Sequence, residues 1–114
     1  MSLLLKKQLL FCEMLAQFIL ELKQMGYSVK FGPDGKKHME NSLHYQSLAM
    51  DLLLFKPDME GRLQYLTHTL DYKPAGERWE AMGGDWGGRF GESQPGAGDG
   101  KDGNHFSLSY RGVR

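Results

Sequence analysis

The sequence contains little cysteine, no excess of charge of either sign and no long uninterrupted apolar run. The one cysteine, Cys12, excludes an intrachain disulfide. A formal net charge of zero, without a basic stripe, argues against nucleic acid as a partner. Polar residues interrupt every apolar segment before it could cross a bilayer, so no membrane insertion is expected. The first residues are apolar and then basic, the reverse of an export signal, which predicts synthesis in the cytoplasm without a signal peptide.

Glycine, in contrast, is concentrated in one segment. Residues 83–103 include nine glycines among 21 positions, and glycine loses more conformational freedom on folding than any other residue. The sequence therefore predicts a flexible glycine-rich loop at about 87–103. Its glycines do not follow a phosphate-binding pattern. The total length of 114 residues suits a single domain, residues 1–114.

Apolar periodicity predicts a small α+β fold. Three- and four-residue steps over residues 3–25 predict an amphipathic helix that covers a sheet, and Gly26 marks its end. Pro74 at a first helical position predicts a second helix that ends at residue 82. Short alternating or apolar segments predict strands at residues 27–31, 48–55, 63–66 and 105–110. The expected architecture is a small antiparallel sheet with flanking helices. A monomer is expected because no spare apolar stripe is evident.

Two imidazoles and a carboxylate occupy positions from which they could hold one metal ion. His44 and Asp51 are seven residues apart, and His105 opens the last predicted strand. On a regular strand this odd spacing places His44 and Asp51 on opposite faces, so the chain would have to bend near Ser47. On a helix the same spacing places both on one face. Zinc takes three such protein ligands and keeps one position open in hydrolytic sites.

Asp102 is the candidate base because it lies three residues before His105 in a glycine-flanked loop. From there a carboxylate could accept a proton from water at the metal. Asp51 lies within an apolar run, where a carboxylate requires either a cation or exposure at a sheet edge. A histidine in polar surroundings is more often a surface residue than a ligand. His38 and His68 are therefore predicted at the surface, with His38 also a weak alternative ligand.

These residues form motifs that resemble a known enzyme family. The segment from Ser42 to Asp51 is similar to the S-x-H-x-x-G-x-A-x-D signature of zinc D-alanyl-D-alanine carboxypeptidases and L-alanyl-D-glutamate endopeptidases. The tryptophan- and glycine-rich segment 79–90 resembles that of small phage members, and segment 102–106 resembles their D-x-x-H-F ending. The family shares its fold with the zinc domain of hedgehog proteins. The resemblance thus implies a hedgehog/DD-peptidase-like fold.

The resemblance also implies a role for each residue. His44, Asp51 and His105 would bind one zinc ion. Asp102 would be the general base and later the acid, and Ser42 would orient a carboxylate of the substrate. The substrate would be a peptidoglycan stem peptide. In phage members the role is lysis of the host cell wall, which the enzyme reaches at the periplasm through a membrane lesion made by a holin.

Two departures from the family pattern leave alternatives open. Ser47 replaces the glycine of the signature, and the arginine that usually precedes the first zinc histidine is absent. The remaining candidates for that positive charge are Lys30, Lys36, Lys37 and Arg89. The missing arginine favours, as an alternative, a non-catalytic zinc-stabilised domain that binds cell wall or protein. A metal-free phage structural or accessory protein is a third interpretation, and it leaves Asp51 without a partner.

Overall fold

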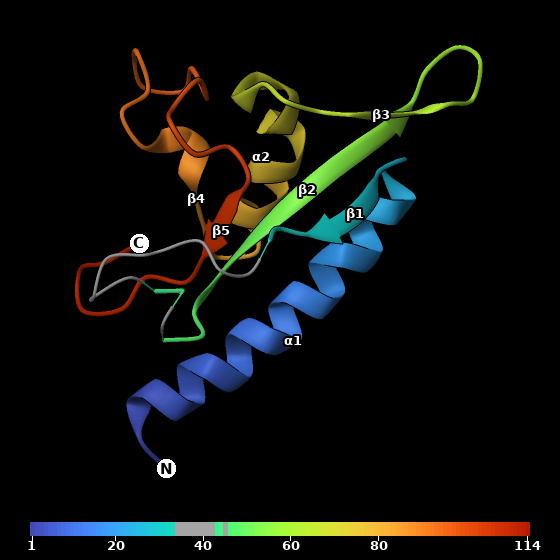
Figure 1. Ribbon diagram of the computed structural model, residues 1–114. Coiled ribbons are helices and arrows are strands. Elements are labelled where there is room, and N and C mark those ends of the chain that lie inside the picture. The colour runs from blue at the N-terminus through green and yellow to red at the C-terminus, as the bar shows by residue number, and fades with distance from the viewer. Residues whose placement is uncertain (34–42, 45) are drawn as a thin grey trace.

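The computed structural model describes residues 1–33, 43–44 and 46–114. It shows an α+β protein with helices against a five-stranded antiparallel sheet, which confirms the predicted fold class (Figure 1). The helices are α1 (Leu3–Gln24), the 3-10 helix η1 (Thr69–Tyr72), α2 (Lys73–Ala81) and the 3-10 helix η2 (Gly87–Arg89). The strands are β1 (Ser28–Phe31), β2 (Ala49–Pro57), β3 (Leu63–Tyr65), β4 (Asp85–Trp86) and β5 (His105–Ser107).

The last strand in sequence lies in the interior of the sheet. The strand order is β1-β2-β5-β4, and β3 pairs with the far end of β2. β2 is longer than predicted because Lys56 and Pro57 pair with β3, whereas β5 is shorter than predicted and ends at Ser107. No sequence pattern predicts β4, since two residues carry no periodicity. The order places β5 directly against β2 and so brings together segments that are distant in sequence.

The sequence at each end of α1 suits a helix boundary. The side chain of Ser2 accepts a hydrogen bond from the backbone N–H of Leu5 at the N-terminal end. At the other end Gly26 has a φ of 98°, which a residue with a side chain adopts only with strain. The predicted end of the first helix is therefore confirmed.

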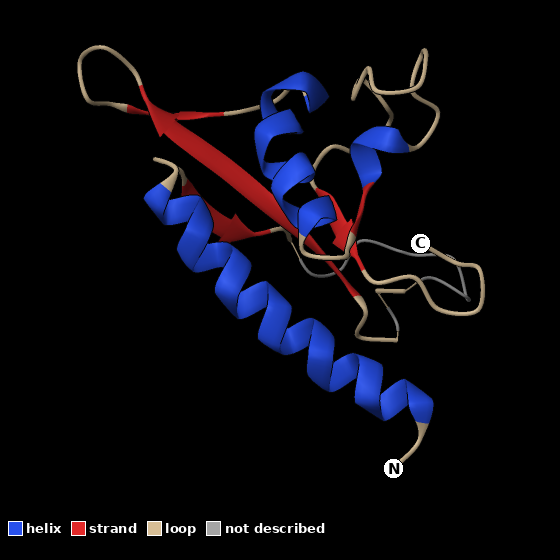
Figure 2. Ribbon diagram, turned by 180° about the vertical axis from the view of Figure 1, so that it is seen from behind, coloured by secondary structure: helices blue, strands red, loops and turns tan. Residues whose placement is uncertain are grey.

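α1 and α2 cover the same face of the sheet, as Figure 2 shows from behind. The buried residues of α1 are Phe11, Leu15, Phe18 and Leu22. Trp79 of α2 is fully buried, and its ring centroid lies 5.0 Å from that of Phe18. Its indole N–H donates to the carbonyl of Ser107 on β5. Phe106 of the same strand packs on Phe18 at 5.1 Å. These large apolar contacts fix β5 beneath the helices.

The opposite face of β2 is less deeply buried than the core face, and the candidate site lies on it. Side chains alternate between the two faces along a strand. Leu52 and Leu54 are fully buried in the core with the helices, whereas Asp51, Leu53 and Phe55 are half-buried on the other face. Each core leucine thus turns its neighbours outward. The apolar residues around Asp51 therefore do not all lie in the core, because alternate side chains point to opposite faces of the sheet.

α1 leaves several large apolar side chains exposed. They are Leu3, Leu5, Leu9, Leu10 and Leu20. These leucines lie off the face that α1 buries, so the helix does have apolar side chains to spare, contrary to the premise that no spare apolar stripe is evident. The monomeric state itself stays a prediction. Among the described residues, no helix combines the length and the apolar character that crossing a membrane requires.

Candidate metal centre

His44, Asp51 and His105 meet on the less buried face of the sheet. Each offers one ligand atom, and the three atoms lie within 4.8 Å of one another. Asp51 and His105 are directly opposite in the register between β2 and β5, so both side chains project from the same face. The structure thus brings together the three residues that the sequence suggested as ligands, although 61 residues separate the two histidines.

The separations of the three atoms resemble those around a four-coordinate zinc ion. His44 Nε2 lies 3.2 Å from His105 Nδ1 and 3.4 Å from Asp51 Oδ1, and His105 Nδ1 lies 3.9 Å from Asp51 Oδ1. Ligands bound at about 2.0–2.1 Å in a tetrahedron are about 3.3–3.4 Å apart. Two edges of the observed triangle are close to this length and the third is slightly longer. The group can therefore bind one metal ion after a small adjustment.

The surroundings of Asp51 also suit a cation. The side chains of Asp51, His44 and His105 are 14%, 16% and 6% exposed. Asp51 Oδ1 is inaccessible to solvent and accepts no hydrogen bond from the described residues. A buried carboxylate oxygen that accepts no hydrogen bond is destabilising unless a positive charge compensates it. A metal ion at the centre of the triangle would supply that charge.

A tight turn positions His44. Leu43 is fully buried beside it, and the Leu43 carbonyl accepts a hydrogen bond from the N–H of Gln46. Ser47 has a φ of 56°, in the left-handed region, so the predicted bend near this residue is confirmed. Helix α1 supports the turn, since the side-chain amide of Gln8 donates to the Gln46 carbonyl at 2.8 Å.

Substitutions of Ser47 test this turn. The left-handed conformation costs a non-glycine residue about 1–2 kcal/mol, and glycine costs about 0.5–1 kcal/mol in conformational entropy. We therefore expect Ser47→Gly to leave stability unchanged or raise it by less than about 1 kcal/mol. Ser47→Val is expected to lower it by more than about 1 kcal/mol, because branched side chains fit this conformation worst.

Chemical denaturation with zinc present measures the free energy of unfolding of both variants. Ser28→Val, on exposed strand β1, is the matched control, and an equal loss there would contradict the prediction.

Asp102 lies beside the cluster of His44, Asp51 and His105, called the metal group below, rather than within it. Its Oδ2 is 3.8 Å from His105 Nδ1, and its side chain is 37% exposed. The loop that contains Asp102 is held in place by Trp86, whose indole N–H donates to the Gly103 carbonyl at 2.7 Å. Gly87 lies so close to the backbone of Asp102 that a Cβ atom there would overlap it. A carboxylate held next to an open coordination position can exchange protons with water there.

Within the glycine-rich segment, Arg89 is bound by carboxylates. Its guanidinium forms ion pairs with Glu80 at 2.9 Å and with Glu92 at 3.3 Å. The hydrogen bond to Glu80 raises the pKa of Arg89 above its usual value. Glu92 in turn accepts the N–H of Gly98, which lowers the pKa of Glu92. The ion pairs of Arg89 therefore connect this segment to Glu80 of α2 and to Glu92 within the segment. The flexibility expected of the segment stays a prediction.

The other residues singled out in the sequence fall in different places. Lys30 is exposed on β1, directly opposite Leu53 in the register with β2. His68 is exposed, as predicted. Four further residues, Ser42, His38, Lys36 and Lys37, lie outside the described residues, and the roles suggested for them stay predictions.

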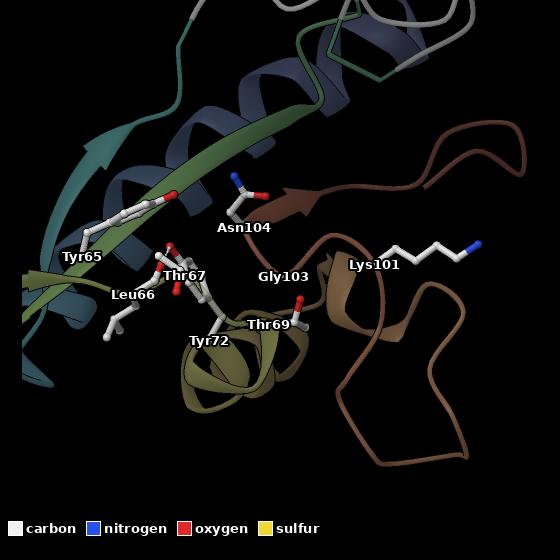
Figure 3. Close-up of a pocket in the computed structure, with 8 residues that line it drawn as sticks. All are labelled: Tyr65, Leu66, Thr67, Thr69, Tyr72, Lys101, Gly103 and Asn104. Carbon is white, nitrogen blue, oxygen red and sulfur yellow. Dashed lines mark hydrogen bonds between the residues drawn. The ribbon is translucent and has the colours of Figure 1, made fainter.

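Two hollows that no sequence pattern predicted are both lined by Asn104, the residue before His105. The first has a volume of about 410 Å³, is mainly apolar, and is lined by Pro33, Asp51, Leu53, Phe55, Tyr65 and Asn104. The second, of about 160 Å³, is polar and lies between η1 and the loop before β5 (Figure 3). Burial raises the pKa of Tyr72, in its wall, to about 12. Tyr65 and Asn104 belong to both hollows, and the candidate ligand Asp51 belongs to the first.

Comparison of the chain with protein-family models, with curated proteins and with solved structures finds no match. The assignment of the site therefore depends on its own residues and distances. The family resemblance of the motifs stays an expectation.

Proposed function

We propose that the chain is a zinc-dependent peptidase that cleaves peptidoglycan stem peptides. The observation that carries the proposal is the position of Asp102 beside the cluster of His44, Asp51 and His105. A structural zinc site is closed by four protein ligands, whereas a hydrolytic site has three ligands and an open position. The three-ligand cluster found among the described residues, with a partly exposed carboxylate next to it, supports a hydrolytic site.

The donor set supports zinc as the metal. Two imidazole nitrogens and one carboxylate oxygen are common ligands of hydrolytic zinc. The same set binds ferrous iron in oxygenases. A carboxylate placed to exchange protons with water is what hydrolysis requires, and the motifs resemble those of zinc peptidases. Both considerations favour zinc.

Each residue of the candidate centre would have its own role in hydrolysis. When bound, zinc would polarise the scissile carbonyl and lower the pKa of a water molecule to about 7. Asp102 accepts a proton from the attacking water and returns it to the leaving amine as the peptide bond breaks. Asp51 would neutralise part of the charge of the bound zinc ion, and His44 and His105 would hold the ion in position.

The substrate and the place of action follow from the family resemblance. The peptides would be stem peptides that contain D-amino acids, cut at an L-Ala-D-Glu or a D-Ala-D-Ala bond. Ser42 would orient a carboxylate of the substrate. In a phage-type lysis the protein would reach the wall through a holin-made lesion in the membrane. The non-catalytic zinc-stabilised binding domain is the alternative.

Metal analysis followed by wall digestion tests the proposal. Elemental mass spectrometry of the purified protein is expected to find about one zinc ion per chain rather than iron. Incubation of the zinc-bound protein with purified peptidoglycan is expected to release peptides with new amino termini or free D-alanine, and removal of zinc with a chelator to stop the release. One zinc without cleavage would favour the binding domain. No zinc after incubation with excess metal would contradict both functions.

A further inference from the structure

The apolar hollow beside the metal group follows the less buried face of β2. Asp51, Leu53 and Phe55 line it in succession because alternate residues of a strand share a face. At about 3.3 Å per residue, the strand advances about 13 Å from Asp51 to Phe55. An extended peptide of about four residues has the same length. The hollow therefore extends from the metal group by the length of a peptide segment rather than of a single amino acid.

Tyr65 widens this apolar surface beyond β2. It lies directly opposite Phe55 in the register of β2 and β3, and the two ring centroids are 5.3 Å apart. Tyr65 is 49% exposed. An aromatic pair that stays open on a sheet face beside a candidate catalytic centre provides contact area for a ligand.

Asn104 supplies a neutral polar group in the same hollow. It lies between the candidate base Asp102 and the ligand His105, and its backbone carbonyl accepts the N–H of Leu52 at 2.9 Å. Figure 3 shows the hydroxyl end of Tyr65 pointing toward Asn104. A side-chain amide offers two donors and an acceptor, which match the N–H and C=O of a peptide group. One amide beside an apolar surface is the combination that orients a ligand in a binding site.

We propose that Leu53, Phe55 and Tyr65 form a peptide track that binds an extended segment of the substrate on one side of the cleaved bond. Asn104 holds a backbone group of that segment. The ligand class is a peptide with about four residues on the track side of the cleaved bond and an apolar side chain facing the track. A charged side chain facing the track would lose its hydration without gaining a partner. This inference rests on the proposed peptidase function.

Two variants on one strand test the track. Tyr65→Ala removes a ring that is 49% exposed, whereas Leu63→Ala removes a 58% exposed apolar side chain of β3 that does not line the hollow. The substrates are a five-residue stem peptide and its shortest fragment that is still cleaved. Tyr65→Ala is expected to lower kcat/KM for the long peptide about tenfold, the effect of losing one well-buried aromatic contact. It should leave the short peptide and the zinc content unchanged, and Leu63→Ala should leave all three unchanged.

The outcomes separate the track from the peptidase function. If Tyr65→Ala lowers kcat/KM equally for the long and the short peptide, or for neither, the track is contradicted and the proposed peptidase function is not. If the zinc-bound wild type cleaves neither peptide, the proposed function fails, and calorimetric binding of the long peptide then decides about the track. Weaker binding by Tyr65→Ala, but not by Leu63→Ala, supports it. Equal binding by the wild type and both variants overturns it.

Discussion

Replacement of Asp102 by asparagine is expected to abolish most of the turnover while zinc stays bound. Asparagine has the same shape but cannot accept a proton at neutral pH, and loss of a general base typically costs about 10²–10⁴-fold in rate. Zinc should stay because the three clustered ligand atoms belong to His44, Asp51 and His105, and none of them belongs to Asp102. Steady-state cleavage of a stem peptide and metal analysis of the same sample measure the two effects.

The control for this variant is Asp99→Asn. Asp99 is an exposed carboxylate of the same loop, and its Oδ1 accepts the N–H of Ser93, which an asparagine oxygen can also accept. Turnover close to that of the wild type is expected. Full activity in Asp102→Asn would remove Asp102 from the mechanism. Loss of zinc in that variant would instead make Asp102 a ligand.

Zinc is expected to stabilise the protein strongly, and Asp51→Asn is expected to remove most of that stabilisation. A ligand that binds only the folded chain contributes about 4 kcal/mol at a free concentration 1,000-fold above its dissociation constant. For a domain of this size that is a rise in unfolding temperature on the order of 10–20 °C. Asp51 supplies the anionic ligand atom, so a neutral amide at this position binds the metal weakly. Thermal unfolding of chelator-treated protein, with and without added zinc, measures the difference.

Asp85→Asn is the matched control for this experiment. Asp85 is another half-buried carboxylate of the sheet, on β4 opposite Ser107, and it is outside the metal group. Its variant should keep the full zinc-dependent rise. Without metal, Asp51→Asn should be at least as stable as the wild type, because it removes a buried carboxylate oxygen that accepts no hydrogen bond from the described residues. Equal zinc responses in the two variants would show that the metal binds elsewhere.

The candidate metal ligands could be predicted from the sequence because each lies in a short segment with a recognisable pattern. An aspartate in an apolar run requires compensation, and an odd spacing to His44 requires a bend, which the structure shows at Ser47. The strands and helices that position these residues have clear periodicity. Their pairing could not be derived in the same way, yet His105 reaches Asp51 only through the register of β5 with β2.

The peptide track and the exposed leucines of α1 were beyond sequence patterns for a related reason. Leu53 and Leu54 are the same residue type, but Leu53 faces the hollow and Leu54 faces the core. Tyr65 reaches the hollow through its pairing with Phe55 across a hairpin. In α1 the spacing of the buried residues identifies the covered face, but it does not say whether another part of the chain covers Leu5 and Leu20. Periodicity shows that a segment has faces, whereas packing decides what each face contacts.

The place of β5 in the sheet determines when a nascent chain can assemble the candidate metal centre. β5 lies between β2 and β4, although it follows both in sequence. Until the ribosome has released this strand, β2 and β4 each present an unpaired edge, and such edges favour aggregation. The same late segment includes His105 and Asp102, so the metal group and its candidate base would be completed together. A nascent chain that ends before residue 102 therefore lacks both the candidate base Asp102 and the candidate ligand His105.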